Sequence, residues 1–173
     1  GAPSFREVAQ LGSALDLGFV IQLRDFMPNA VGGVLWYGND DPNMVAYTPV
    51  YCSATKEPEC YNPKDADGVT FSWNSAFWIE NWVANMVYPR YSQLFPSLKK
   101  ARQELEDKYA AQQAQIENKA QMLLKEDPAR AKAYLTDYSA ECAQTMMQRW
   151  KKLGEYLIVK FNDQAIKPEK EEK

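Results

Sequence analysis

The chain has 173 residues, of which 46% are hydrophobic and 25% are charged, a composition ordinary for one globular domain. Its net charge of −3 and its lack of a basic tract with interleaved aromatic residues give no electrostatic basis for binding nucleic acid. No apolar run approaches the roughly 20 residues that a helix needs to cross a bilayer. We therefore expect a single domain over residues 1–173, with neither nucleic acid nor a membrane among its partners.

Strand signals occupy the amino-terminal third of the chain. Residues 5–17 predict one helical turn or an extended lead-in, and residues 18–26 predict a strand that stops before Pro28, which lacks a backbone donor. Residues 34–37 and 44–51 predict two further strands, because the Gly, Asn, Asp and Pro residues between them are typical of a hairpin turn. Three strands alone would leave long exposed edges, so we expect another layer to cover them.

A polar loop over residues 53–73 follows, and it is either the rim of a functional site or a mobile segment. Helical spacing of apolar residues then begins, with Asn74 or Ser75 as the N-cap and with Pro89 ending or kinking the first helix.

Residues 94–125 and 128–162 predict two long helices that form an antiparallel arm, the second with a break near Thr136. The predicted fold class is therefore α+β. It comprises strands and loop over residues 1–73, a helical region over residues 74–166 and a charged, disordered tail over residues 167–173.

Two motifs are unusual, the first within residues 30–51 and the second within residues 75–91. The first contains the run Trp36-Tyr37-Gly38-Asn39-Asp40-Asp41-Pro42 and the second the run Phe77-Trp78-Ile79-Glu80-Asn81-Trp82. In order and spacing they resemble the carboxy-terminal half of the bacterial dipeptidases of the N-terminal nucleophile (Ntn) hydrolase class. The resemblance extends to Gln22-Leu23-Arg24, Met27-Pro28 and the closing helix over residues 150–161.

The resemblance implies a four-layer fold, with two stacked sheets between helical layers, and a peptidase that hydrolyses short peptides without metal or cofactor. It also implies that the first residue of the mature enzyme, a Cys, is the nucleophile and that its free α-amine is the base. This chain begins with Gly1-Ala2-Pro3-Ser4 and contains no His, so a Ser-His or Cys-His pair is excluded. We expect a carboxy-terminal fragment with no catalytic residue of its own, inactive alone, whose nucleophilic Cys lies upstream in a missing amino-terminal half.

Four residues are candidates for substrate binding, namely Arg24, Asn39, Asp40 and Asn81. Asp40 could accept a charge-assisted hydrogen bond from the α-amine of a peptide, although adjacent turn carboxylates more often only form the turn. Arg24 interrupts an apolar strand, and a guanidinium suits bidentate binding of a substrate carboxylate. Its alternative role is an ion pair with Asp25, Asp40 or Asp41, because a buried Arg needs a partner.

The two amides Asn81 and Asn85 are four residues apart and share a helix face, where they either line a pocket or tie the helix to a loop. Asn39 belongs to the Asn-Asp-Asp turn that recurs in the resemblance.

The three cysteines leave the compartment open. Cys52 and Cys60 could close a small disulfide, which would favour a periplasmic or secreted protein, or they are free thiols of a cytoplasmic one. Together with Cys142 they lack the spacing of a zinc site, so no metal is expected.

A different class of function also fits the sequence, a non-catalytic protein-interaction or dimerisation domain. A third alternative is an amidase acting on acyl-amide substrates. Whether the chain is part of a dipeptidase or an interaction domain, we expect an associating surface formed by Trp36, Trp73, Trp78 and Trp82. It would bind a second copy or the missing half.

Overall fold

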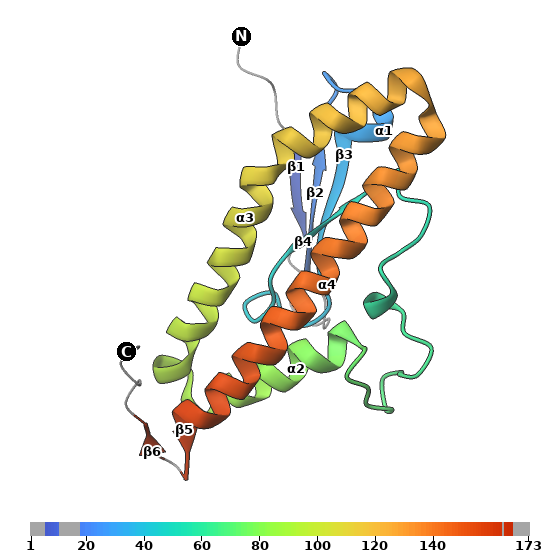
Figure 1. Cartoon of the computed structure of the whole chain (residues 1–173). Coiled ribbons are helices and arrows are strands. Elements are labelled where there is room, and N and C mark those ends of the chain that lie inside the picture. Colours follow the sequence, from blue (N-terminus) through green and yellow to red (C-terminus); the bar gives the residue numbers. More distant parts are fainter. Residues whose placement is uncertain (1–5, 11–17, 164, 168–173) are drawn as a thin grey trace, which may run out of the picture.

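The computed structural model describes residues 6–10, 18–163 and 165–167, and it confirms the α+β class. Four antiparallel strands come first and are paired in chain order. The later part is helical and ends in a two-stranded hairpin, and the two long helices run antiparallel as predicted (Figure 1). The elements are β1 (Arg6–Gln10), β2 (Gly18–Leu23), α1 (Asn29–Gly32), β3 (Gly33–Gly38), β4 (Thr48–Tyr51), η1 (Glu59–Tyr61), α2 (Ala76–Val87), η2 (Tyr88–Arg90), α3 (Tyr91–Glu126), α4 (Pro128–Lys160), β5 (Phe161–Asn162) and β6 (Ala165–Ile166).

The strand predictions need two corrections. Of the two alternatives for the lead-in, residues 6–10 show the extended one and form β1, while residues 5 and 11–17 lie outside the described part. The first predicted strand ends at Leu23, not at residue 26, because the chain turns where the Met27 amide donates to the Arg24 carbonyl. The last begins only at Thr48, because residues 41–47 continue the turn, with the Met44 amide bonded to the Asp41 carbonyl.

The helical predictions hold with two exceptions. Ser75 is the N-cap of α2 and accepts from the Trp78 amide, and Pro89 lies in the 3-10 turn η2 that separates α2 from α3. The predicted break near Thr136 is wrong, since its hydroxyl donates to the Lys132 carbonyl within a continuous α4. The prediction of helix to residue 162 is also wrong: α4 ends at Lys160, and β5 pairs with β6. Of the tail over residues 167–173, residues 168–173 lie outside the described part.

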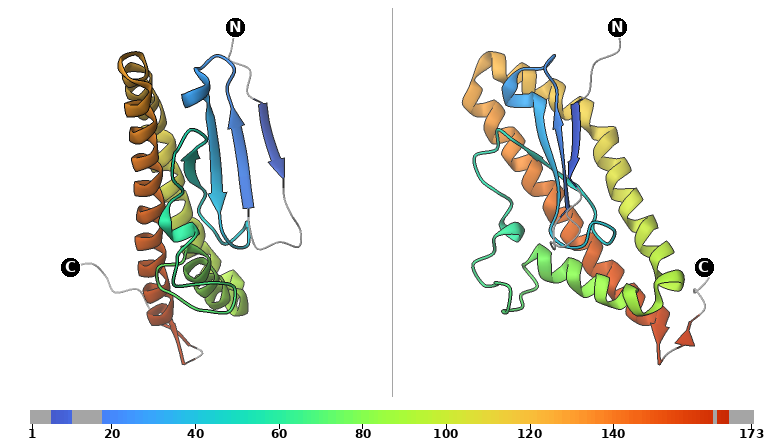
Figure 2. Two further views of the ribbon diagram at one scale, coloured as in Figure 1. Left: turned by 90° about the vertical axis from the view of Figure 1, so that its right-hand side faces the viewer. Right: turned by 180° about the vertical axis from the view of Figure 1, so that it is seen from behind.

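The arm of α3 and α4 covers one face of the sheet (Figure 2). On the other face the Tyr61 ring of η1 packs against Tyr37 at one end, and no other described helix or strand covers it. Register places Ile21, Leu35 and Val50 side by side across β2, β3 and β4. Leu35 and Val50 line an open groove of about 790 Å³, and Leu23 on β2 is 51% exposed. By contrast Val34, the neighbour of Leu35 in β3, is fully buried. The sheet is therefore apolar on both faces but covered on one.

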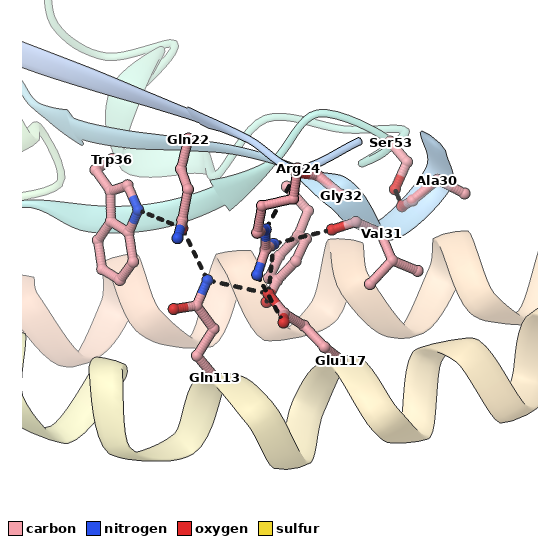
Figure 3. A network of polar contacts seen from close by, with 10 residues as sticks. Gln22, Arg24, Ala30, Val31, Gly32, Trp36, Ser53, Gln113 and Glu117 are labelled. Carbon is pink, nitrogen blue, oxygen red and sulfur yellow. Dashed lines mark hydrogen bonds and ion pairs between the residues drawn. The ribbon is translucent and has the colours of Figure 1, made fainter. Parts of the chain in front are cut away.

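A buried ion pair joins the sheet to the arm (Figure 3). Just beyond the end of β2, the Arg24 guanidinium contacts both carboxylate oxygens of Glu117 in α3, with Nη1–Oε2 at 2.7 Å and Nη2–Oε1 at 2.6 Å. It also donates to the carbonyl oxygens of Val31 and Gly32. Arg24 is paired as predicted, but its partner is Glu117 rather than any of the three aspartates expected.

The same carboxylate collects two neutral donors. The Tyr51 hydroxyl from β4 and the Gln113 amide from α3 both donate to Glu117 Oε1, at 3.0 Å each. Gln113 also donates to Gln22 Oε1 at 2.9 Å, and the Trp36 indole donates to the same oxygen (Figure 3). Hydrogen bonds therefore satisfy the charges on both sides of the interface.

The outer edge of β4 is closed within the chain. Pro49 offers no backbone donor, and the Tyr51 amide donates to the hydroxyl of Ser139, a fully buried residue of α4, at 3.1 Å. A strand edge without free donors is a poor template for pairing with another chain. The exposed edge expected from the sequence is therefore covered on the β4 side.

The Trp82 ring of α2 packs against the last turns of α4. A Cβ atom at Gly154 would overlap the Trp82 ring, so only glycine permits this approach of the two helices.

We expect Gly154→Ala to lower the free energy of unfolding by about 1–3 kcal/mol, because the added methyl must displace the ring in a packed interface. Urea denaturation measures the change. Gly68→Ala is the control, since a Cβ there meets nothing within 4 Å. Equal free energies of unfolding of the two variants would show that the Trp82 ring does not pack against Gly154.

Candidate functional site

The turn after β3 delivers Asn39 and Asp40 to the side of α2. The Asn39 backbone amide donates to Glu80 Oε2 at 2.8 Å, and its side-chain oxygen accepts from the Tyr37 hydroxyl at 2.8 Å. Asp40 is 3% exposed, and its Oδ1 lies 3.5 Å from the donating amide nitrogen of Asn81. Three of the four predicted site residues thus come together with Glu80, and we call Asn39, Asp40, Glu80 and Asn81 the turn–helix cluster.

Helix α2 positions the second half of this cluster. Its buried face includes Ala76, Ile79, Val83 and Val87, and Glu80 lies within the same face and is fully buried. Asn81, one residue on, is half-buried and accepts from the Asn85 side chain through both its backbone and its side-chain oxygen. The two asparagines share one helix face, as their spacing predicted, and they are bonded to each other there.

Asp41, the second carboxylate of the turn, has a structural role. Its Oδ1 accepts from the Asn43 amide at 2.8 Å, and its Oδ2 accepts from the Tyr88 hydroxyl in η2. These bonds form the turn and fasten it to the junction between α2 and α3. The two adjacent aspartates therefore differ, with Asp40 directed to the cluster and Asp41 to the scaffold.

Glu80 is the member of the cluster that the sequence analysis did not select. Burial raises the pKa of its carboxyl well above the ordinary value, and the negative charge of Asp40 raises it further against the opposing hydrogen bond from Asn39. Its Oε1 has no hydrogen-bond partner among the described residues. The sequence does contain a sign of this role, because Glu80 lies inside the apolar stripe of an amphipathic helix, where ionisable side chains are rare.

Arg24 lies away from the other candidates. Arg24 follows Leu23, which pairs with Gly33 at the start of β3, whereas the cluster begins after Gly38 at the end of β3. Gly33 and Gly38 are five residues apart along the strand, a distance of about 17 Å. Its guanidinium is bound by Glu117, and the whole residue is only 7% exposed. Binding of a substrate carboxylate by Arg24 stays a prediction, and it would require displacing this ion pair.

The cysteines are unbridged, and none has the environment of an activated nucleophile. Cys52, Cys60 and Cys142 are free thiols, so of the two sequence alternatives the structure shows the unpaired one. Burial raises the pKa of Cys60 and of Cys142 to about 12 each, and partial desolvation raises that of Cys52. Protonated thiols are poor nucleophiles.

The family model of peptidase family C69 matches residues 14–104, which is more than half of the chain and includes the whole turn–helix cluster. The chain belongs to peptidase family C69. No curated protein matches it. Membership in C69 confirms the predicted peptidase class, and thus a hydrolase, and the match covers both motifs from which that class was predicted.

Two further findings concern the described residues only. They contain no group of three or more His, Cys, Asp or Glu side chains arranged to hold a metal ion. Within the same part of the chain, no helix combines the length and the apolar character that crossing a membrane requires.

The buried Glu80 makes stability depend on pH. With a raised pKa in the folded state, Glu80 keeps its proton at pH values where the unfolded chain has released it, so stability falls as pH rises above the unfolded-state value. Glu80→Gln removes this titration. We expect the loss of unfolding free energy between about pH 5 and about pH 8 to shrink by on the order of 1 kcal/mol or more.

Urea denaturation across this pH range measures the effect, with Glu59→Gln as the control because Glu59 is exposed. If wild type and Glu80→Gln show the same pH dependence, Glu80 is not a buried protonated carboxyl.

Proposed function

We propose that this chain is the carboxy-terminal portion of a bacterial dipeptidase of the Ntn hydrolase class. A Cys at the mature amino terminus of the whole enzyme, upstream of this portion, supplies the nucleophile. This portion supplies one sheet, one wall of the substrate pocket and the helical arm, as a single domain over residues 1–173. Membership in peptidase family C69 supports the peptide substrate, and the resemblance of the two motifs supports the narrower class.

The turn–helix cluster is the observation on which the proposal depends. Asp40 is a buried carboxylate that accepts from the Asn81 side-chain amide, on a turn whose Asn39 backbone amide is bonded to Glu80. A carboxylate in such a position can accept a charge-assisted hydrogen bond from the α-ammonium group that every dipeptide carries. Because Glu80 bonds the turn backbone, Asp40 and Asn39 need little reorganisation on binding, which favours affinity.

The uncovered sheet face supports a second sheet packed against it. Leu23, Leu35 and Val50 would be buried by the four-layer arrangement that the resemblance implies, at the spacing of about 10 Å usual for stacked sheets. The missing amino-terminal half would supply that layer.

A non-catalytic interaction or dimerisation domain is the second candidate, and an exposed apolar patch of Val69, Phe71 and Trp73 favours it. Val69 is 91%, Phe71 47% and Trp73 49% exposed, and the rings of Phe71 and Trp73 are in edge contact. A second copy could bury this patch. Of the four tryptophans expected to form one associating surface, Trp36 instead faces the arm (Figure 3).

The test is hydrolysis by the protein encoded by the complete open reading frame. It should release amino acids from a panel of dipeptides, and the isolated 173-residue chain should not. Asp40→Asn should lower kcat/KM by about tenfold to a hundredfold, because a charge-assisted hydrogen bond to the substrate is weakened. Asp137→Asn, on the exposed surface of α4, should leave the rate unchanged.

Absence of dipeptide hydrolysis by the complete protein would leave the interaction domain as the better account. Hydrolysis by the isolated chain, abolished by a substitution within it, would contradict the assignment of the nucleophile to an upstream Cys.

A further inference from the structure

A cavity of about 360 Å³ lies between the loop that precedes α2 and the middle of α4. One wall comes from Gln144, Met147 and Lys151, which recur on one face of α4. The loop supplies the opposite wall, including Lys64 and Trp73. The volume falls within the range of small-molecule sites, about 300–1,000 Å³.

The loop is fastened on both sides of this cavity. At η1, Cys60 is buried, and the Tyr61 ring packs edge-on against Tyr37 with centroids 4.8 Å apart. At the other side, Trp73 packs edge-on against Trp82, which in turn rests on Gly154 of α4.

Between these anchors, Asp65 closes the loop on itself. Its Oδ2 accepts from the Ser72 hydroxyl at 2.7 Å and from the Asn74 side chain at 2.9 Å. The cavity is thus formed by internal contacts of the chain and does not need a ligand to shape it.

Three charged side chains that line the cavity are unpaired within the part of the chain that the structure describes. Among the described residues, Lys64, Lys151 and Glu59 form no ion pair or hydrogen bond through their side chains, although all three line the cavity. The Asp65 carboxylate accepts hydrogen bonds from neutral groups of the loop. Two lysines, one glutamate and the Trp73 ring therefore line the same cavity, and among the described residues the three charged side chains have no partner.

We propose that this cavity binds a small zwitterion with a free carboxylate, an amino acid or the carboxyl-terminal residue of a short peptide. Lys64 and Lys151 bind the carboxylate, Glu59 binds the ammonium group of a free amino acid, and an apolar side chain packs against Trp73 and Met147. The site is distinct in its residues from the turn–helix cluster and goes beyond the proposed function, since it requires binding but no hydrolysis. It also provides two cations that have no partner in the described part of the chain, whereas the Arg24 guanidinium is occupied by Glu117.

The test measures binding of L-phenylalanine to the 173-residue chain by isothermal titration calorimetry, repeated with the complete protein. We expect saturable binding that Lys64→Gln and Lys151→Gln each weaken about threefold to fivefold, and that both together weaken about tenfold or more. Lys152→Gln is the matched control, because Lys152 is exposed, next in sequence and outside the cavity. Circular dichroism melting confirms that each variant is folded.

Two analogues identify the recognised group. L-Phenylalaninamide, which lacks the carboxylate, should bind at least about tenfold more weakly. L-Alanyl-L-phenylalanine reports whether a peptide carboxyl terminus is accepted, and binding of it or of L-phenylalanine supports the proposal. No saturable binding of either ligand, equal binding of the amide, or equal effects of Lys151→Gln and Lys152→Gln would overturn it. If the complete protein binds these ligands in the cavity but hydrolyses no dipeptide, only the proposed function is refuted.

Discussion

The Arg24–Glu117 ion pair is the contact on which the arrangement of sheet and arm depends. It takes two full charges out of water, which is costly unless each is neutralised and its remaining hydrogen-bonding capacity is filled. Here the two side chains contact at 2.6 and 2.7 Å, and two backbone carbonyls, Tyr51 and Gln113 supply the remaining bonds. Few relative positions of the sheet and α3 meet all these requirements, so the pair selects one register between them.

The positions of the cluster and of the cavity follow from that register. Ser139 of α4 closes the edge of β4, and Trp82 of α2 packs against Gly154 near the end of the same helix. The turn after β3 can therefore meet α2 where Asn39 bonds Glu80, and the loop between β4 and α2 must run beside α4. A shift of the arm along the sheet would move both sites together.

Local sequence rules predicted the start of a helix correctly where only neighbouring residues determine it. Ser75 caps α2, and the helix predicted from residue 128 begins there as α4, with Asp127 as its N-cap and Pro128 in its first turn, because side-chain capping and a proline in the first turn need only neighbouring residues. They were wrong where tertiary contacts decided. Residues 44–46 have strand-like composition but are buried outside the sheet, and Thr136 stays within a continuous α4, where its hydroxyl accepts from the Thr55 amide at 2.9 Å.

The same distinction applies to the candidate site. Asn39, Asp40 and Asn81 were predicted from a motif, and the chain brings them together. Glu80 was missed because its role depends on a hydrogen bond across 41 positions of sequence, and Glu117 as the partner of Arg24 lies 93 positions away. Sequence spacing carries no information on pairs so distant, although burial of Arg24 implied that some carboxylate must be found.

A double-mutant cycle on Arg24 and Glu117 tests the central claim most directly. Arg24→Met and Glu117→Gln each leave one buried charge unpaired, so each should lower the free energy of unfolding in urea by about 3–5 kcal/mol. The double variant should lose much less than the sum, with a coupling energy above about 2 kcal/mol. The exposed pair Arg130–Glu126 on the arm, at 3.0 Å, should give about 0.3–0.5 kcal/mol in the same experiment. Additive effects of the two Arg24 and Glu117 substitutions would contradict the account.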